Sequence, residues 1–377
     1  MVRDLTELGK LHSSKWLRYP ADVLPMHVAE MDFEVDPGVR AMLTEMVAKS
    51  DLGYLGPIPE VAEAFVGFAQ RHWGWTPDAA QVRMTTDVGV GVVEVIRALS
   101  KPGDKVIINS PVYHSFYMWL DELHLTTVDA PLIHEGDLWR LDIAAIEAQF
   151  KAGARFILLS SPHNPAGRIH TLEELTAIAE LSNKYNAYVL SDEIHAPLTF
   201  KEQPFIPFLS VSEAAAEVGV AVSAASKGWN IAGLKCAIII SQTEKMHEKL
   251  NELPPALHYR ASLLGAFATV AAFEKGEPWL DQAIEILDEN RQLIANLISA
   301  RIPAVKYAMP HCSYLAWLDV SALNLGEDPG AVLIEKAKVA FNSGHIYGAL
   351  GKSHVRFNFA TSPAIITEAI ERIARVL

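Results

Sequence analysis

Short apolar segments alternate with longer amphipathic segments between about residues 85 and 241. The apolar segments are rich in β-branched residues and end in turn-forming residues: KVIINS (105–110), RFILLSS (155–161), AYVLSD (187–192), GVAVSAA (219–225) and CAIIIS (236–241). Amphipathic segments such as GVVEVIRALS and TLEELTAIAELSNKYN lie between them. This alternation predicts an α/β domain with a mostly parallel sheet. Only about ten residues join the last two segments, too few for a helical crossover, which predicts that they pair antiparallel.

The pattern changes after about residue 260, where long helical periodicities dominate. RASLLGAFATVAAFEKG and PWLDQAIEILDENRQLIANLISA precede the strand-like SYLAWLDV and HVRFNFA, and PAIITEAIERIARVL ends the sequence. These segments predict a smaller α+β domain. We expect the boundary near 255–285, where a helix would connect the two halves.

The composition is that of a folded globular protein and argues against several other classes. Half of the residues are hydrophobic and a fifth are charged, and neither a membrane-spanning run nor a secretory signal is present. The two cysteines, Cys236 and Cys312, are too few for a disulfide framework and form no metal-binding spacing. Acidic residues outnumber basic ones by 45 to 32, which argues against nucleic-acid binding. We therefore expect a cytoplasmic protein that binds neither a membrane nor a nucleic acid.

Polar residues follow three of the predicted strands at their carboxyl ends, where ligands bind in open parallel α/β sheets. Each of these short motifs is weak evidence alone, but their order and common placement indicate a ligand site. The residues that they present are His163 and Asn164 after RFILLSS, Asp192, Glu193 and His195 after AYVLS, and Lys227 after VAVSAAS.

Lys227 has the most specific candidate chemistry. It is either a lysine that reaches the surface from a strand end, or a partly desolvated amine that forms a Schiff base with a carbonyl. Asp192 is either a cap or surface carboxylate, or a buried partner that keeps a pyridine nitrogen protonated. Asn164 is either a turn residue before Pro165 or a donor to a phenolic oxygen of a cofactor ring.

The segment MTTDVGVGVVEVIRALS contains a partial glycine motif. Gly89-x-Gly91 resembles the start of a dinucleotide fingerprint, but Glu94 replaces the third glycine and we expect no strong strand before it. The turn TTDVG opens a helix, so the N–H groups of Val88 and Gly89 form either an ordinary helix start or a phosphate site.

Two further residues have both a structural and a functional interpretation. Tyr113, after a strand end in SPVYHSFY, either packs in the core or lies against a planar ring. Arg356 in HVRFNFA forms either a structural ion pair or a bidentate clamp for a carboxylate. The sequence contains no HExxH, GxSxG or other metal or nucleophile motif, so we expect no metal.

Taken in order, SSPHNPAGR, SDEIH, SKGWNIAGLK and HVRFNFA resemble the fold-type I pyridoxal 5′-phosphate (PLP) enzymes of the class I/II aminotransferase superfamily. The resemblance extends from LPMHVAEMDF (24–33) to the final helix. Together with LGYLGP and YLAWLD, these motifs are similar to the MalY/PatB group of cystathionine and cysteine-S-conjugate β-lyases. The family fold implies an N-terminal arm over 1–35 that contributes to the small domain, a large PLP-binding domain over 36–265 and a small domain over 266–377.

The resemblance also implies a role for each candidate residue. Lys227 would carry PLP covalently and later move the Cα proton of the substrate, and Arg356 would bind the substrate carboxylate. The other cofactor contacts would be Tyr113 stacked on the ring, Asp192 at the pyridine nitrogen, Asn164 and His195 near the 3′ oxygen, and Val88, Gly89, Ser226, Lys235 and Tyr54 at the phosphate. Tyr54 would come from a second subunit, which implies a homodimer with its sites at the interface.

The implied activity is a β-elimination that converts L-cystathionine or a cysteine S-conjugate to a thiol, pyruvate and ammonia, as in methionine biosynthesis. An aminotransferase uses the same residues and is the first alternative. A PLP-bound regulatory or binding protein with little turnover is the second.

Several positions depart from the usual sequence of the β-lyase group. His27 replaces a common Trp, Glu30 a common Asp, Pro197 a frequent acidic residue, and the pair Gly228-Trp229 a common Thr-Phe. We expect these positions to lie near the substrate pocket, and Gly228-Trp229 to be the first place to look for an altered substrate preference.

Overall fold

A seven-stranded sheet forms the centre of the computed structural model, which describes residues 1–377. Its strand order is β2-β10-β9-β8-β7-β3-β4, and only β10 runs antiparallel to its neighbours. The strands are β2 (Val82–Thr85), β3 (Lys105–Ile108), β4 (Thr126–Asp129), β7 (Ala154–Ser160), β8 (Tyr188–Asp192), β9 (Gly219–Ser223) and β10 (Ala237–Ile240). The predicted mostly parallel sheet and the antiparallel β9–β10 pair are therefore confirmed.

Two edge strands were not predicted. We expected no strong strand before the glycine motif, but β2 precedes it, and β4 forms the opposite edge of the sheet. Val82 and Arg83 of β2 are only half-buried, and Thr126 and Asp129 of β4 are exposed. Because an edge strand buries little apolar surface, its sequence lacks the continuous apolar run of a central strand.

Helices cover both faces of this sheet. Neighbouring residues of β3 point to opposite sides, so that Ile107 packs in one buried cluster while Val106 and Ile108 pack in another. Helices α5 and α6 cover one face and α4, α8 and α13 the other. The helices are α1 (Leu5–Leu8), α2 (Ser14–Leu17), α3 (Pro37–Ala48), α4 (Glu60–Trp73), α5 (Val88–Leu99), α6 (Ser115–Glu122), α7 (Ile143–Lys151), α8 (Leu172–Lys184), α9 (Glu213–Val218), α10 (Ala225–Gly228), α11 (Glu244–Lys249), α12 (Ala256–Tyr259), α13 (Leu263–Lys275), α14 (Glu277–Arg301), α15 (Pro329–Ala337) and α16 (Pro363–Ala374).

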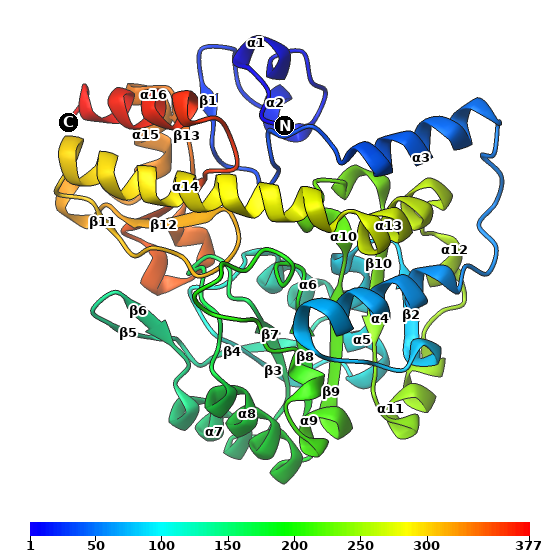
Figure 1. Ribbon diagram of the computed structural model, residues 1–377. Coiled ribbons are helices and arrows are strands. Elements are labelled where there is room, and N and C mark those ends of the chain that lie inside the picture. Colours follow the sequence, from blue (N-terminus) through cyan, green and yellow to red (C-terminus); the bar gives the residue numbers. More distant parts are fainter.

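A second, smaller sheet is built from the C-terminal part of the chain. Its order is β11-β12-β15-β14, all antiparallel, and α14, α15 and α16 pack around it (Figure 1). The remaining strands are β1 (Leu24–Pro25), β5 (Ile133–Glu135), β6 (Leu138–Arg140), β11 (Lys306–Tyr307), β12 (Leu315–Asp319), β13 (Val339–Ala340), β14 (Asn342–Ser343) and β15 (His354–Asn358). The N-terminal β1 pairs with β13, so the first residues of the chain join this second unit.

One long helix connects the two units. In Figure 1, α14 extends from the side of α16 toward α13, and the two helices α13 and α14 are separated at Gly276. A Cβ at Gly276 would lie 2.3 Å from Nε1 of Trp229, so this break requires glycine. We propose that the two sheets mark two domains, a large one over 36–265 and a small one over 266–377, and that the N-terminal arm over 1–35 contributes to the small domain.

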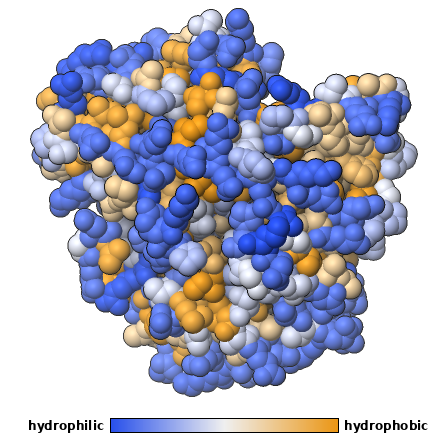
Figure 2. All heavy atoms as spheres, viewed as in Figure 1, coloured by the Kyte–Doolittle hydropathy of each residue, from blue (hydrophilic) through white to orange (hydrophobic).

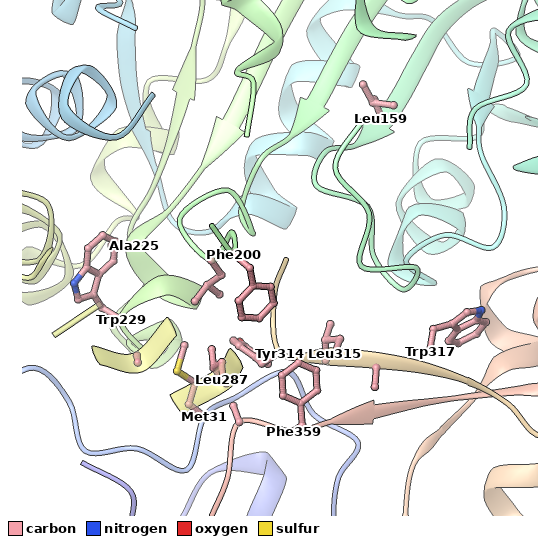
Figure 3. Close-up of a cluster of buried hydrophobic side chains, with 14 of the residues drawn as sticks. Met31, Leu159, Phe200, Ala225, Trp229, Leu287, Tyr314, Leu315, Trp317 and Phe359 are labelled. Carbon is pink, nitrogen blue, oxygen red and sulfur yellow. The ribbon is translucent and has the colours of Figure 1, made fainter. Parts of the chain in front are cut away.

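Buried apolar side chains fill the space between the two units. Figure 3 shows Met31, Leu287, Tyr314 and Phe359 together, contributed by the N-terminal segment, α14, the start of β12 and the end of β15. The visible face of the molecule carries mainly hydrophilic residues, with apolar ones in separate patches (Figure 2). None of the helices has the length and apolarity needed to cross a membrane.

Candidate active site

A cavity of about 790 Å³ opens at the carboxyl ends of the parallel strands. β2 ends at the same edge, because β10 is antiparallel to both β2 and β9. Every candidate residue of the implied site except Tyr54 lines this cavity: Val88, Gly89, Tyr113, Asn164, Asp192, His195, Ser226, Lys227, Lys235 and Arg356. Residues separated by up to 268 positions in the chain therefore meet in one site.

Lys227 extends into the cavity from α10, the short helix after β9. Its Nζ donates a hydrogen bond to the carbonyl oxygen of Ala29 at 2.6 Å. Burial, aided by the nearby Arg356 guanidinium, lowers the pKa of Lys227 to about 8, although Glu30 and Asp192 oppose the shift. The amine is therefore much more readily deprotonated near neutral pH than an ordinary lysine.

Asp192, the last residue of β8, is buried at the inner end of the site. Its Oδ1 accepts a hydrogen bond from the N–H of Ile194 at 3.2 Å, and its side chain has no other hydrogen bond. Burial raises the pKa of Asp192 to about 7, while the Ile194 N–H and Lys227 act in the opposite direction. A cationic group placed against this carboxylate would stabilise its charged form.

Arg356 lies on β15 of the smaller sheet and is 3% exposed. It donates from Nη1 to Oδ1 of Asn164 at 3.1 Å and from Nη2 to the carbonyl oxygen of His27 at 3.0 Å. Its Nε is buried without a partner, and no carboxylate lies within 4.0 Å. This geometry excludes the structural ion pair and leaves a charged donor for an incoming carboxylate.

The start of α5 presents free backbone donors to the cavity. Asp87 caps the helix by accepting from the N–H of Val90 at 2.9 Å, so the N–H groups of Val88 and Gly89 have no partner within the helix. Lys235 forms an ion pair with Asp87 at 2.9 Å beside them. A Cβ at Gly89 would lie 2.8 Å from Cζ2 of Trp119, so glycine is needed at this position.

The remaining candidates occupy different places. Tyr113 lines the cavity with its ring edge-on to Trp119, and Ser226 lies next to Lys227. His195 is buried, its Nδ1 lies 2.9 Å from Oγ of Ser313, and burial lowers its pKa to about 3, which keeps the ring neutral. His163 does not line the cavity, because its Nε2 faces the carbonyl oxygen of Asn109 at 3.3 Å.

Tyr54 lies apart from the cavity of its own chain. It is fully exposed in the segment between α3 and α4. Its predicted role as a contribution from a second subunit stays a prediction.

The N-terminal segment contributes more to the site than its sequence predicted, since only His27 and Glu30 of this segment were expected near the substrate pocket. Arg18, His27 and Ala29 line the cavity, as does Asn342, which donates to the carbonyl oxygen of His27 at 3.1 Å. Ala29 acts through its backbone carbonyl, which accepts from both Lys227 and the Tyr314 hydroxyl group. A backbone acceptor has no sequence signature, since every residue type supplies one.

Residues 21–373 match the family model described as aminotransferase class I and II. The chain belongs to this family. A cystathionine beta-lyase of Corynebacterium glutamicum is 34% identical, over 99% of both chains. The cystathionine beta-lyase PatB of Bacillus subtilis is 31% identical over 94% of this chain and 93% of its own length. The solved PLP-bound C-S lyase of Staphylococcus hominis is 27% identical, with a TM-score of 0.90 over 97% of this chain and 95% of that one.

The departures from the family sequence do not all lie at the cavity. His27 lines it. The other departures, Glu30, Pro197, Gly228 and Trp229, do not. Trp229 is fully buried between Phe68 and Phe273, and its Nε1 donates to the carbonyl oxygen of Gly276 at 2.9 Å. Our expectation that Gly228-Trp229 borders the substrate pocket was therefore wrong, because the turn of α10 directs Trp229 into the core.

The position of Trp229 predicts a large effect on stability. Trp229→Ala should lower the free energy of unfolding by about 3–5 kcal/mol, the usual cost of removing a buried aromatic side chain. Urea denaturation of both proteins measures this difference. Trp229→Phe keeps most of the packing and should cost less; equal midpoints for wild type and Trp229→Ala would contradict the prediction.

Proposed function

We propose that this protein is a PLP-dependent carbon–sulfur β-lyase that acts on L-cystathionine or related cysteine S-conjugates. The observation that carries the proposal is one cavity that joins a lysine of lowered pKa, a buried carboxylate and an arginine without a carboxylate partner. The names of the full-length relatives, cystathionine beta-lyase and C-S lyase, support the same reaction.

The residues of the cavity fit PLP. The unpaired N–H groups of Val88 and Gly89 and the Lys235 ammonium suit a phosphate group. Asp192 has a carboxylate oxygen free for a protonated pyridine nitrogen, and Lys227 offers an amine for the aldehyde. Asn164, His195, Ser226 and Tyr113 complete the proposed cofactor site, with Tyr54 supplied by a second subunit.

Three side chains of this protein then have separate roles in the reaction. PLP, when bound, supplies a cationic ring that accepts the electron pair left at the substrate Cα. Arg356 binds the α-carboxylate and fixes the orientation of the Cα–H bond. Lys227, whose pKa is about 8, removes the Cα proton as a neutral amine. Asp192 would hold its negative charge against the pyridine nitrogen throughout. The Cβ–S bond breaks with its electron pair on sulfur, and the thiolate takes up a proton and leaves as a thiol. Water then converts the remaining three-carbon fragment to pyruvate and ammonia.

One experiment separates this reaction from transamination. Purified holoprotein is incubated with L-cystathionine without a keto acid, and pyruvate and free thiol are followed. The lyase releases both products in equal amounts. Turnover that requires an added keto acid would instead assign an aminotransferase, and the absence of any turnover would favour a binding protein.

The lowered pKa of Lys227 predicts how cofactor uptake depends on pH. A neutral amine is needed to attack the aldehyde, so the rate of reconstitution of the cofactor-free protein should rise with pH and be half-maximal near pH 8. An unperturbed lysine would give a midpoint near 10.5. Stopped-flow absorbance measures the rate.

Arg356→Gln removes a cation that lowers the pKa of Lys227, so the pH midpoint of reconstitution should be higher in this variant. A wild-type midpoint above about pH 10 would contradict the assignment of Lys227 as the amine that binds the cofactor.

We also propose that the active form is a homodimer in which Tyr54 enters the neighbouring site. Its complete exposure on an irregular segment supports this arrangement. Light scattering tests it, because a mass near that of a single chain would contradict a dimer.

A further inference from the structure

His27 is a buried histidine with no hydrogen-bond partner for its ring. His27 is one of the residues that line the cavity and is only 1% exposed, and both Nδ1 and Nε2 are buried without a hydrogen-bond partner. Unpaired buried polar atoms are unfavourable in a folded protein and are rare without a functional reason. The ring therefore has unused hydrogen-bonding capacity at the cavity wall.

The ring of His27 is neutral. Burial, together with the positive charges of Arg18, Lys15 and Arg356, lowers its pKa to about 4. At neutral pH the imidazole thus offers one N–H donor and one lone-pair acceptor.

Arg18 brings a positive charge to the same part of the cavity wall. It follows α2 and is exposed, and no carboxylate of the chain lies within 4.0 Å of it. Its guanidinium lies 5.7 Å from the ring centroid of Tyr19, and Tyr19 in turn contacts His27 edge-on at 4.9 Å. Arg18 and His27 therefore both lie against the ring of Tyr19.

A buried ion pair fixes α2 and hence the position of Arg18. Lys15 and Asp32 are almost completely buried and form an ion pair at 2.8 Å, and Nε1 of Trp16 donates to the same carboxylate at 2.9 Å. Such a pair is costly to break, since either charge alone would remain buried. Arg18 is thus held on a rigid element, although its own side chain is exposed.

The backbone of His27 joins this region to the proposed site of the substrate carboxylate. Its carbonyl oxygen accepts from Nη2 of Arg356 at 3.0 Å, and Arg356, His27 and Arg18 all line the same cavity. An amino acid bound through its α-carboxylate to Arg356 would therefore share this cavity with His27 and Arg18.

We propose that Arg18 and His27 form a subsite for the leaving group, which selects a thiol that carries a carboxylate. Arg18 binds that carboxylate, and the neutral His27 ring accepts a hydrogen bond from an adjacent ammonium group. The homocysteine half of L-cystathionine has both groups. This inference rests on the proposed β-lyase function and specifies its substrate class.

The test compares two substrates that differ in the leaving group. L-cystathionine carries the distal amino acid group, and S-ethyl-L-cysteine lacks it. Arg18→Met should lower kcat/KM for L-cystathionine roughly 10- to 100-fold, as expected for a charge-assisted hydrogen bond, with less than about a threefold change for S-ethyl-L-cysteine. The matched control is Arg40→Met, which removes an exposed arginine outside the cavity and should change neither value. An equal loss on both substrates, or no loss, would overturn the proposal.

A second variant excludes a purely structural role for His27. His27→Phe keeps the ring contact with Tyr19 but removes both nitrogens, so selectivity for L-cystathionine should fall while the denaturation temperature stays equal or rises. A lower denaturation temperature with unchanged selectivity would overturn the proposal.

Failure of the proposed function gives a different result. If the wild-type holoprotein releases pyruvate from neither substrate, the lyase assignment fails. Calorimetric binding then decides on the subsite: tighter binding of L-cystathionine than of S-ethyl-L-cysteine, lost in Arg18→Met, supports it, and equal binding overturns it.

Discussion

Replacing Lys227 by alanine is expected to abolish the release of pyruvate from L-cystathionine. Loss of the proton-transferring amine alone should reduce turnover by roughly 10²–10⁴-fold, and loss of the covalent attachment of the cofactor adds to this. The effect is large because no other amine is available: the second lysine of the cavity wall, Lys235, is paired with Asp87. A coupled lactate dehydrogenase assay measures the pyruvate.

The control for this experiment is Lys352→Ala, which removes an exposed lysine outside the cavity and should retain wild-type turnover. Circular dichroism of both variants verifies the fold. Pyruvate release by Lys227→Ala at the wild-type rate would refute the assigned role.

Replacing Arg356 by glutamine should reduce kcat/KM on the order of 10²-fold or more, because loss of one partner of a buried charged pair costs about 2–5 kcal/mol. Most of the loss should appear in KM, since the proposed role of Arg356 is to bind the substrate carboxylate both before and during the reaction. Arg356→Lys keeps the positive charge but loses the bidentate geometry of the guanidinium group, so its activity should lie between those of Arg356→Gln and the wild type.

A second measurement distinguishes this role from a structural one. Arg356 lowers the pKa of Lys227, so the pH at which cofactor reconstitution is half-maximal should be higher in the Arg356→Gln variant. A merely loosened fold would not produce this shift. A kcat/KM within threefold of wild type, with an unshifted profile, would contradict the prediction.

The sequence was most informative where buried strands end in polar residues. β7, β8 and β9 are continuous apolar runs, and the parallel arrangement of such runs brings Asn164, Asp192 and Lys227 to one edge. Local patterns therefore predicted the large sheet and the centre of the site. Arg356 could be placed at the site only through the family resemblance, because its position depends on how the second sheet packs against the first.

Other features could not be obtained from the sequence for physical reasons. The edge strand β4 has mixed polarity because one side of it meets solvent. Trp229 is two residues from Lys227, and residues two apart on a helix point in nearly opposite directions, about 200° apart. Proximity along the chain therefore did not mean proximity in the site. Arg18 contributes through the tertiary position of α2, which is determined by the distant Asp32.

The N-terminal segment has a consequence for the way this protein gains its activity. Carbonyl groups of residues 28–33 accept hydrogen bonds from Asn230 beside the large sheet and from Asn358 of the smaller one. The segment has almost no regular secondary structure, so its conformation is determined by these distant side chains. We expect it to become ordered only after both sheets have formed and docked. The catalytic amine, which bonds to Ala29 of this segment, would thus reach its final position among the last events of folding, and a nascent chain would remain inert until both units are assembled.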